Sequence, residues 1–189
     1  MDQLAKAPIT MCFTNATWAE GTTSTLSTTG TTRYTIDSFF YTKTALTNQA
    51  TPTTDWATGN AFIPMPIPLT STGLGPGIPA AAAGYACAFL LGFDHSGNLK
   101  AIQGPIVACD TSGNPIQAPS FSAQLGPAGS VQSSDNDFCP CGYIVVKSGS
   151  TAVATFTFGT TSWSTTGYTT SLGDLASVPG RALNGLTYT

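Results

Sequence analysis

The sequence predicts an all-β protein: a small antiparallel sandwich or barrel with an extended N-terminal arm and a C-terminal tail. Short runs of β-branched and aromatic residues alternate with turn-forming residues along the 189-residue chain. Its 20 glycines and 13 prolines mark frequent turns. Threonine is abundant and favours extended backbone over helix. We expect an arm over residues 1–33, a β-rich domain over residues 34–183 and a tail over residues 184–189.

The predicted arm is almost uncharged and of low complexity between Glu20 and Thr32. Such a segment cannot bury enough apolar surface to fold alone. It is expected to be mobile in an isolated monomer, or an arm ordered by a neighbouring subunit in an assembly. Its partner-binding residues are then the apolar anchors Met11, Phe13, Trp18 and Leu26.

The first elements of the predicted domain are less regular. Aromatic residues in Arg33–Lys43 predict a strand that enters the core. The segment that follows is expected to be a loop or a single helical turn capped by Thr54 or Asp55. Prolines alternate with apolar residues in Phe62–Leu69, which predicts an extended segment at a sheet edge or across a surface.

The middle of the chain predicts a meander or small barrel. Tyr85–Phe93 is a continuous apolar run and is expected to be a buried strand. Leu99–Cys109 is expected to hold the next strand pair. The turn motif Asp-x-Ser-Gly-Asn begins at Asp94 and again at Asp110, and it separates these runs.

A hairpin is predicted from Cys139–Lys147 and Thr151–Phe158, which flank a short Ser-Gly-Ser connection. In its second half, Phe156 and Phe158 fall on one face, the alternation of a half-buried strand. A further strand is expected at Tyr168–Ser171. The last predicted partner-binding residues are the apolar side chains at the end of the chain, Leu183, Leu186 and Tyr188.

Composition excludes several classes of partner. Charged residues make up 8% of the chain, against about 25% in an average protein. With a net charge of −3 and six scattered Lys and Arg residues, no nucleic-acid partner is expected. The longest apolar stretch, residues 78–93, is interrupted and too short for a membrane helix. The N-terminus lacks the pattern of a secretory signal, so synthesis in the cytoplasm is expected.

The five cysteines do not predict a disulfide framework, because their number is odd and their spacing irregular. Cys139 and Cys141 resemble half of a metal site, with Cys87 or Cys109 as further ligands. Structural zinc sites use closer pairs, so buried free thiols are favoured over a metal or a disulfide. No metal and no cofactor is therefore predicted.

The only histidine, His95, lies between Asp94 and Ser96. These residue types suggest a catalytic triad, but triad members converge from separate parts of a fold. Turn chemistry is the favoured interpretation. Calcium sites at the Asp-rich turns are disfavoured too, since none has a full set of ligand positions. No catalytic residue is predicted.

Two further kinds of site stay open. Asp37, Asp55 and later aspartates can meet in space as a carboxylate pair for glycoside hydrolysis. The single glutamate lies in the predicted arm, which disfavours this. The three tryptophans can stack on sugars, but large aromatics are more often core or interface residues: Trp18, Trp56 and Trp163.

A family resemblance rests on six structural motifs: Ile36-Asp-x-x-x-Tyr-Thr-Lys43, Asp110-x-x-Gly-Asn114, Cys139–Lys147, Phe158-Gly-Thr-Thr-Ser-Trp163, Thr166-Gly167 and Leu175-Ala-x-Val-Pro-x-Arg181. With them, residues 34–183 resemble small structural proteins of tailed bacteriophages, the head decoration or cement proteins. The resemblance implies a non-enzymatic virion protein on the outer capsid surface. It also implies a homotrimer whose partner is the major capsid protein.

Two other hypotheses about the function remain. The first is a host-attachment or carbohydrate-binding module of a phage fibre or tail, which requires exposed aromatic residues beside Asp and Asn. The second is a hydrolase that uses an unrecognised carboxylate pair.

Overall fold

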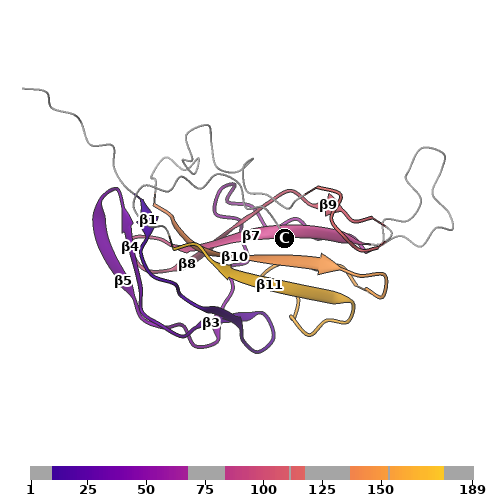
Figure 1. The fold of residues 1–189 in the computed structure, drawn as a ribbon, viewed down its shortest axis with the longest axis horizontal. Coiled ribbons are helices and arrows are strands. Elements are labelled where there is room, and N and C mark those ends of the chain that lie inside the picture. The colour runs from indigo at the N-terminus through magenta and orange to yellow at the C-terminus, as the bar shows by residue number, and fades with distance from the viewer. Residues whose placement is uncertain (1–9, 68–83, 111, 118–136, 153, 177–189) are drawn as a thin grey trace, which may run out of the picture.

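The computed structural model describes residues 10–67, 84–110, 112–117, 137–152 and 154–176. These residues form eleven strands and no helix, arranged in three antiparallel sheets (Figure 1). The all-β prediction is confirmed, and the described sheets form a sandwich-like fold without a closed barrel. In the described part of the chain no helix is long and apolar enough to cross a membrane.

The central sheet has the strand order β11-β10-β7-β8, and β9 also pairs with β7. Its strands are β7 (Tyr85–Phe93), β8 (Leu99–Gln103), β9 (Val107–Ala108), β10 (Cys139–Ser148) and β11 (Tyr168–Asp174). All of β7 after its first residue is buried, as its apolar run predicts. The predicted strand pair after β7 is confirmed as β8 and β9, and the predicted strand near the end of the domain as β11.

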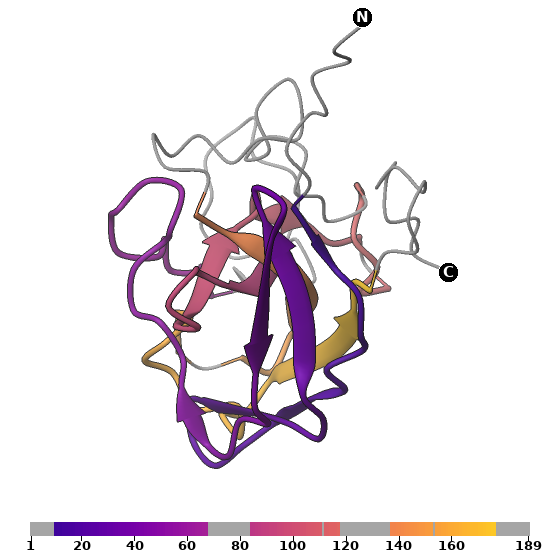
Figure 2. The same cartoon turned by 90° about the vertical axis from the view of Figure 1, so that its left-hand side faces the viewer.

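The second sheet, with the order β1-β4-β5, covers one end of the central sheet (Figure 2). Its strands are β1 (Met11–Cys12), β4 (Thr32–Ile36) and β5 (Phe39–Lys43). The strand predicted over Arg33–Lys43 is thus a hairpin. Asp37 and Ser38 form its turn with φ of 51° and 70°, the left-handed pair of a type I′ turn, whose twist suits two antiparallel strands.

The third sheet corrects the prediction of an N-terminal arm. It has the order β2-β3-β6, made of β2 (Trp18–Glu20), β3 (Thr25–Thr28) and β6 (Gln49–Ala50). Residues 10–33 therefore belong to the packed domain. The backbone N–H and C=O groups of these threonine-rich strands form hydrogen bonds with later segments. Two large side chains anchor the strands in the core, since Trp18 is 7% and Leu26 0% exposed. Residues 1–9 and the predicted tail lie outside the described residues.

The predicted hairpin partner of β10 is also wrong. β10 pairs with β7 on one side and with β11 on the other, so no free edge remains for residues 151–158. Phe156 instead forms an isolated bridge with Met65. Phe156 and Phe158 are buried, at 1% and 0% exposure, so the face predicted to be inward does reach the core. There Phe158 stacks on Phe89 with ring centroids 4.4 Å apart.

Candidate functional site

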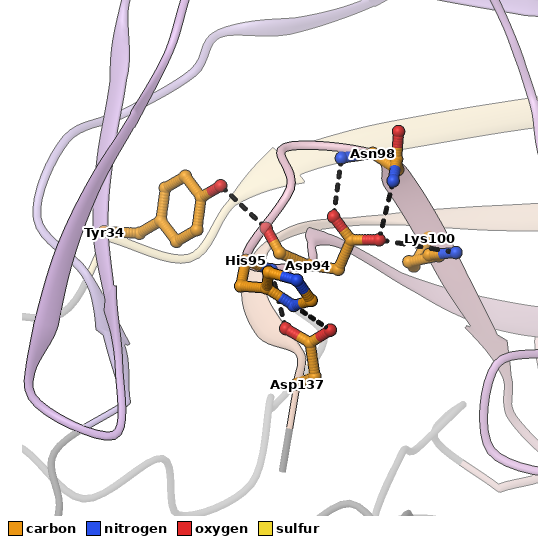
Figure 3. Close-up of polar contacts among 6 residues, drawn as sticks. All are labelled: Tyr34, Asp94, His95, Asn98, Lys100 and Asp137. Carbon is orange, nitrogen blue, oxygen red and sulfur yellow. Dashed lines mark hydrogen bonds and ion pairs between the residues drawn. The ribbon is translucent and has the colours of Figure 1, made fainter. Parts of the chain in front are cut away.

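The turn that joins β7 to β8 contains acidic, basic and histidine side chains, the residue types best suited to chemistry (Figure 3). The Asp94 carboxylate accepts hydrogen bonds from Asn98 N at 2.7 Å and Asn98 Nδ2 at 2.9 Å. Gly97 has a φ of 74°, and its N–H donates to the Asp94 carbonyl at 2.9 Å. The prediction that these residues supply turn chemistry is confirmed.

Asp94 also links this turn to its surroundings. Lys100 Nζ lies 3.5 Å from Asp94 Oδ2, and the Tyr34 hydroxyl on β4 donates to the Asp94 carbonyl at 2.9 Å. Partial burial opposes ionisation of Asp94, but the bonds from Asn98 and the Lys100 ammonium outweigh it, so the pKa of this carboxyl is lowered. Burial raises the pKa of Tyr34, which keeps its hydroxyl a donor. The cluster therefore holds β4 against the β7–β8 turn.

His95 pairs with Asp137 rather than with a nucleophile. The His95 backbone N–H donates to Asp137 Oδ1 at 2.6 Å, and its Nδ1 contacts Asp137 Oδ2. The His95 side chain is 61% exposed. The pair joins residues 42 positions apart, and no local sequence signal indicated it.

The cysteine thiols are buried, as predicted. All five cysteines are free and buried. Burial raises the pKa of Cys87 to about 12. Cys139 and Cys141 lie with their Sγ atoms 4.0 Å apart. In the described ranges, no group of three or more His, Cys, Asp and Glu residues is placed to hold a metal ion.

The remaining candidate residues, Asp55 and the three tryptophans, make contacts that stabilise the fold. Asp55 caps the turn predicted for it, since its Oδ1 accepts from Ala57 N at 2.8 Å, while its Oδ2 accepts from Gln103 N at 2.7 Å. Trp18 and Trp163 are core residues, each 7% exposed. Lys100 Nζ lies over one face of the Trp56 ring, 4.5 Å from its centroid, so that face already has a cationic partner.

An apolar surface lies on the outer side of the β1-β4-β5 sheet. The register places Met11 opposite Thr35, and Thr35 opposite Phe40, so these side chains share one face. Phe13 continues this face beyond β1, because its N–H donates to the Arg33 carbonyl at 2.8 Å. Phe13 is 39% and Phe40 60% exposed, with ring centroids 6.3 Å apart. We call Met11, Phe13 and Phe40 the aromatic face.

The structure separates the residues predicted to bind a partner. Met11 and Phe13 lie on the aromatic face, whereas Trp18 and Leu26 are buried in the core and are not available to a partner in this fold. Leu183, Leu186 and Tyr188 lie outside the described residues. Phe40 was expected in the core, as was Phe39, which is 70% exposed at the end of the hairpin. The turn residues between β4 and β5 were the only signal that this run folds back.

No protein-family model, no curated protein and no solved structure matches the chain.

Proposed function

We propose that the chain is a non-enzymatic structural protein of a phage virion. It decorates the outer capsid surface and stabilises the capsid by bridging neighbouring subunits of the major capsid protein. The single observation that supports this proposal is the aromatic face, an apolar sheet surface on which two phenylalanine rings are exposed side by side. Exposed apolar groups of this kind are typical of sites that bind another protein.

The surroundings of the aromatic face suit a protein partner. The neighbouring pair of residues on the same side of the sheet is Arg33 and Thr42, one charged and one neutral. Aromatic centres with a polar rim, and Arg within that rim, are typical of protein interfaces. In a chain with 8% charged residues, few charged side chains must be desolvated when it binds a partner.

A homotrimer would present three copies of the aromatic face to the capsid. Several modest contacts on one rigid particle bind together far more tightly than each alone, because the later contacts form at a high effective concentration. Bridging neighbouring capsid subunits in this way resists their separation. The proposed site of action is accordingly the virion surface, and the proposed partner is the major capsid protein.

The test compares a variant of the aromatic face with a matched control. We expect Phe13→Ser with Phe40→Ser to weaken the affinity for capsids of the encoding phage at least ~30-fold, the effect of losing a hot spot of about 2 kcal/mol. Ile116→Ser is the control, because Ile116 is 68% exposed and follows β9 of the central sheet. Occupancy is measured by co-sedimentation with capsids that lack the protein.

Light scattering of the free protein accompanies this test. A trimer that binds capsids through the aromatic face supports the proposal. Unchanged occupancy of the double variant, or an equal loss in the Ile116→Ser control, contradicts it. A monomer that ignores capsids contradicts it as well, and directs attention to the host-attachment alternative.

A further inference from the structure

The outer edge of β5 carries backbone groups that point away from its sheet. β5 is an edge strand, and within the described part of the chain it pairs only with β4. The Arg33 N–H donates to Thr14 Oγ1 at 2.8 Å and the Arg33 carbonyl accepts from Phe13 N at 2.8 Å, so both groups point toward the β1 side. Thr42 lies opposite Arg33 and therefore directs its own N–H and C=O away from β4, as does Phe40 two residues earlier. The edge thus offers hydrogen-bond donors and acceptors to another strand.

The side chains at this edge are exposed and mostly apolar. Thr42 is exposed, and Phe39 and Phe40 are 70% and 60% exposed. Proteins commonly protect an exposed edge strand with charged residues or proline. Residues 39–42 contain neither. An edge of this kind is typical of a strand that pairs with another chain.

We propose that the edge of β5 pairs with the same edge of a second copy of the chain, antiparallel and with Phe40 of the two copies opposite each other. Such a contact has two-fold symmetry, so each residue pair across it occurs twice, apart from the central one. In this register the outward N–H of Phe40 in each copy donates to the Phe40 carbonyl of the other copy. The two sheets then continue as one sheet across the contact.

Charge complementarity selects this register. With Phe40 at the centre, Asp37 of each copy lies opposite Lys43 of the other, which forms two equivalent pairs of opposite charge. A register centred on Tyr41 would place Lys43 opposite Phe39 instead. One centred on Thr42 would place Lys43 opposite Tyr41. Of these three registers, only the one centred on Phe40 pairs the charges at the two ends of β5.

The same register gives both exposed phenylalanines an aromatic partner. Phe40 meets its own copy, which joins two aromatic faces into one continuous surface. On the other side of the sheet, Phe39 lies opposite Tyr41 of the second copy, a half-buried ring that stacks on Tyr34 with centroids 5.6 Å apart. Aromatic pairs directly opposite each other stabilise antiparallel strands. The pairing therefore accounts for the exposure of Phe39, which lies outside the aromatic face.

This contact differs from the contacts of the proposed homotrimer, because a two-fold contact closes after two copies. It would join one trimer to the next. A contact of so few residues is weak in solution, but a capsid that holds neighbouring copies close together raises their effective concentration. The lateral link on the capsid rests on the proposed function, whereas the pairing itself is a property of the free chain.

The test measures the mass of the free full-length protein by sedimentation at low ionic strength, between about 1 and 500 µM. We expect the mass to rise reversibly with concentration. Lys43→Glu and Asp37→Lys each place like charges opposite each other in both pairs, so each is expected to raise the concentration for half-association about 10-fold. An equimolar mixture of the two variants is expected to restore association, because every mixed contact again holds two pairs of opposite charge.

A second pair of variants tests the backbone contact. Thr42→Pro removes an outward N–H and places a ring at the edge, so it is expected to abolish association. Thr42→Ala keeps the N–H and is the matched control, expected to associate like the unsubstituted protein. The charge variants give the result even where Thr42→Pro fails to fold.

Three outcomes would overturn the proposal: a mass that stays constant up to about 500 µM, association that is unchanged in both charge variants, or a mixture that associates no better than either variant alone. No capsid enters this assay. Its failure therefore leaves the proposed function standing, and loss of capsid binding in the Phe13 and Phe40 double variant leaves this pairing standing.

Discussion

The indole N–H of Trp18 donates a hydrogen bond to the carbonyl oxygen of Cys141, 3.3 Å away. The same ring stacks on Phe93, with centroids 5.9 Å apart. Next to it, Asp174 Oδ1 accepts from the backbone N–H groups of Ala16 and Thr17, each at 2.8 Å. Residues near the N-terminus thus lie on the strands β7, β10 and β11, and they complete the core rather than extend from it.

We expect Trp18→Phe to lower the free energy of unfolding by about 1–3 kcal/mol. Phenylalanine keeps much of the aromatic contact with Phe93 but leaves the buried Cys141 carbonyl with one hydrogen bond fewer. Trp18→Ala also empties a large core volume, and its expected loss is about 3–5 kcal/mol. Urea unfolding followed by circular dichroism measures both.

Trp56→Phe is the matched control for this prediction. The Trp56 indole nitrogen is buried and has no hydrogen-bond partner among the described residues, so its replacement breaks no such bond. Its expected loss is smaller than that of Trp18→Phe. Equal losses in the two variants would show that the bond to Cys141 contributes nothing to stability.

Gly142→Ala is expected to be strongly destabilising, by about 2–4 kcal/mol. A Cβ at this position would lie 2.1 Å from Trp18 Nε1 and 2.9 Å from the Gly173 carbonyl, so either the indole or β11 must move. Gly30→Ala is the control, because the nearest atom to its added Cβ is 4.0 Å away. Thermal unfolding compares the two, and a similar midpoint for both would contradict the packing seen around Gly142.

The sequence predicted the elements whose signal is local. Tyr85–Phe93 is apolar on both faces, and such a run is buried wherever its neighbours lie. The turn at Asp94 carries its own hydrogen-bonding side chains. Contacts between distant segments could not be predicted in this way. Trp18 contacts Cys141, 123 positions away, and nothing in the threonine-rich segment around Trp18 indicates that contact.

The same distinction applies to the candidate sites. Met11 and Phe13 were predicted to bind a partner because they are apolar residues in a polar segment, and the structure leaves Phe13 on an outer face. The exposure of Phe40 was not predicted, since it depends on how β4 pairs with β5 and on which face of that sheet packs against the core. β10 illustrates the limit again, because the adjacent run ending at Phe158 was a good strand pattern, yet β11 pairs with β10.

Ser38→Gly is expected to stabilise the protein by about 0.5–1 kcal/mol. Ser38 has a φ of 70°, a conformation that strains a residue with a Cβ and that glycine adopts freely. The gain is offset in part by the greater freedom of glycine in the unfolded chain. Chemical unfolding measures the change. Ser38→Ala is the control, which is expected to be neutral or destabilising, and a loss of stability with glycine would contradict the strain argument.

Asp94 is expected to make stability depend on pH at the acid end. Its carboxyl has a lowered pKa in the folded state, so the folded protein favours the ionised form. The resulting stability is fully present above the ordinary carboxyl pKa of about 3.9 and is lost as the pH falls through the lower folded value. At pH 7 we expect Asp94→Asn to cost about 1–3 kcal/mol, because charged hydrogen bonds to Asn98 and Lys100 are weakened.

The difference in the free energy of unfolding between the two proteins is expected to shrink between about pH 4 and pH 2, as measured by urea unfolding across that range. Lys100→Met, which keeps the hydrogen bonds from Asn98, is expected to remove only part of this dependence. A difference that stays constant down to pH 2 would mean that the carboxylate does not stabilise the turn through its charge.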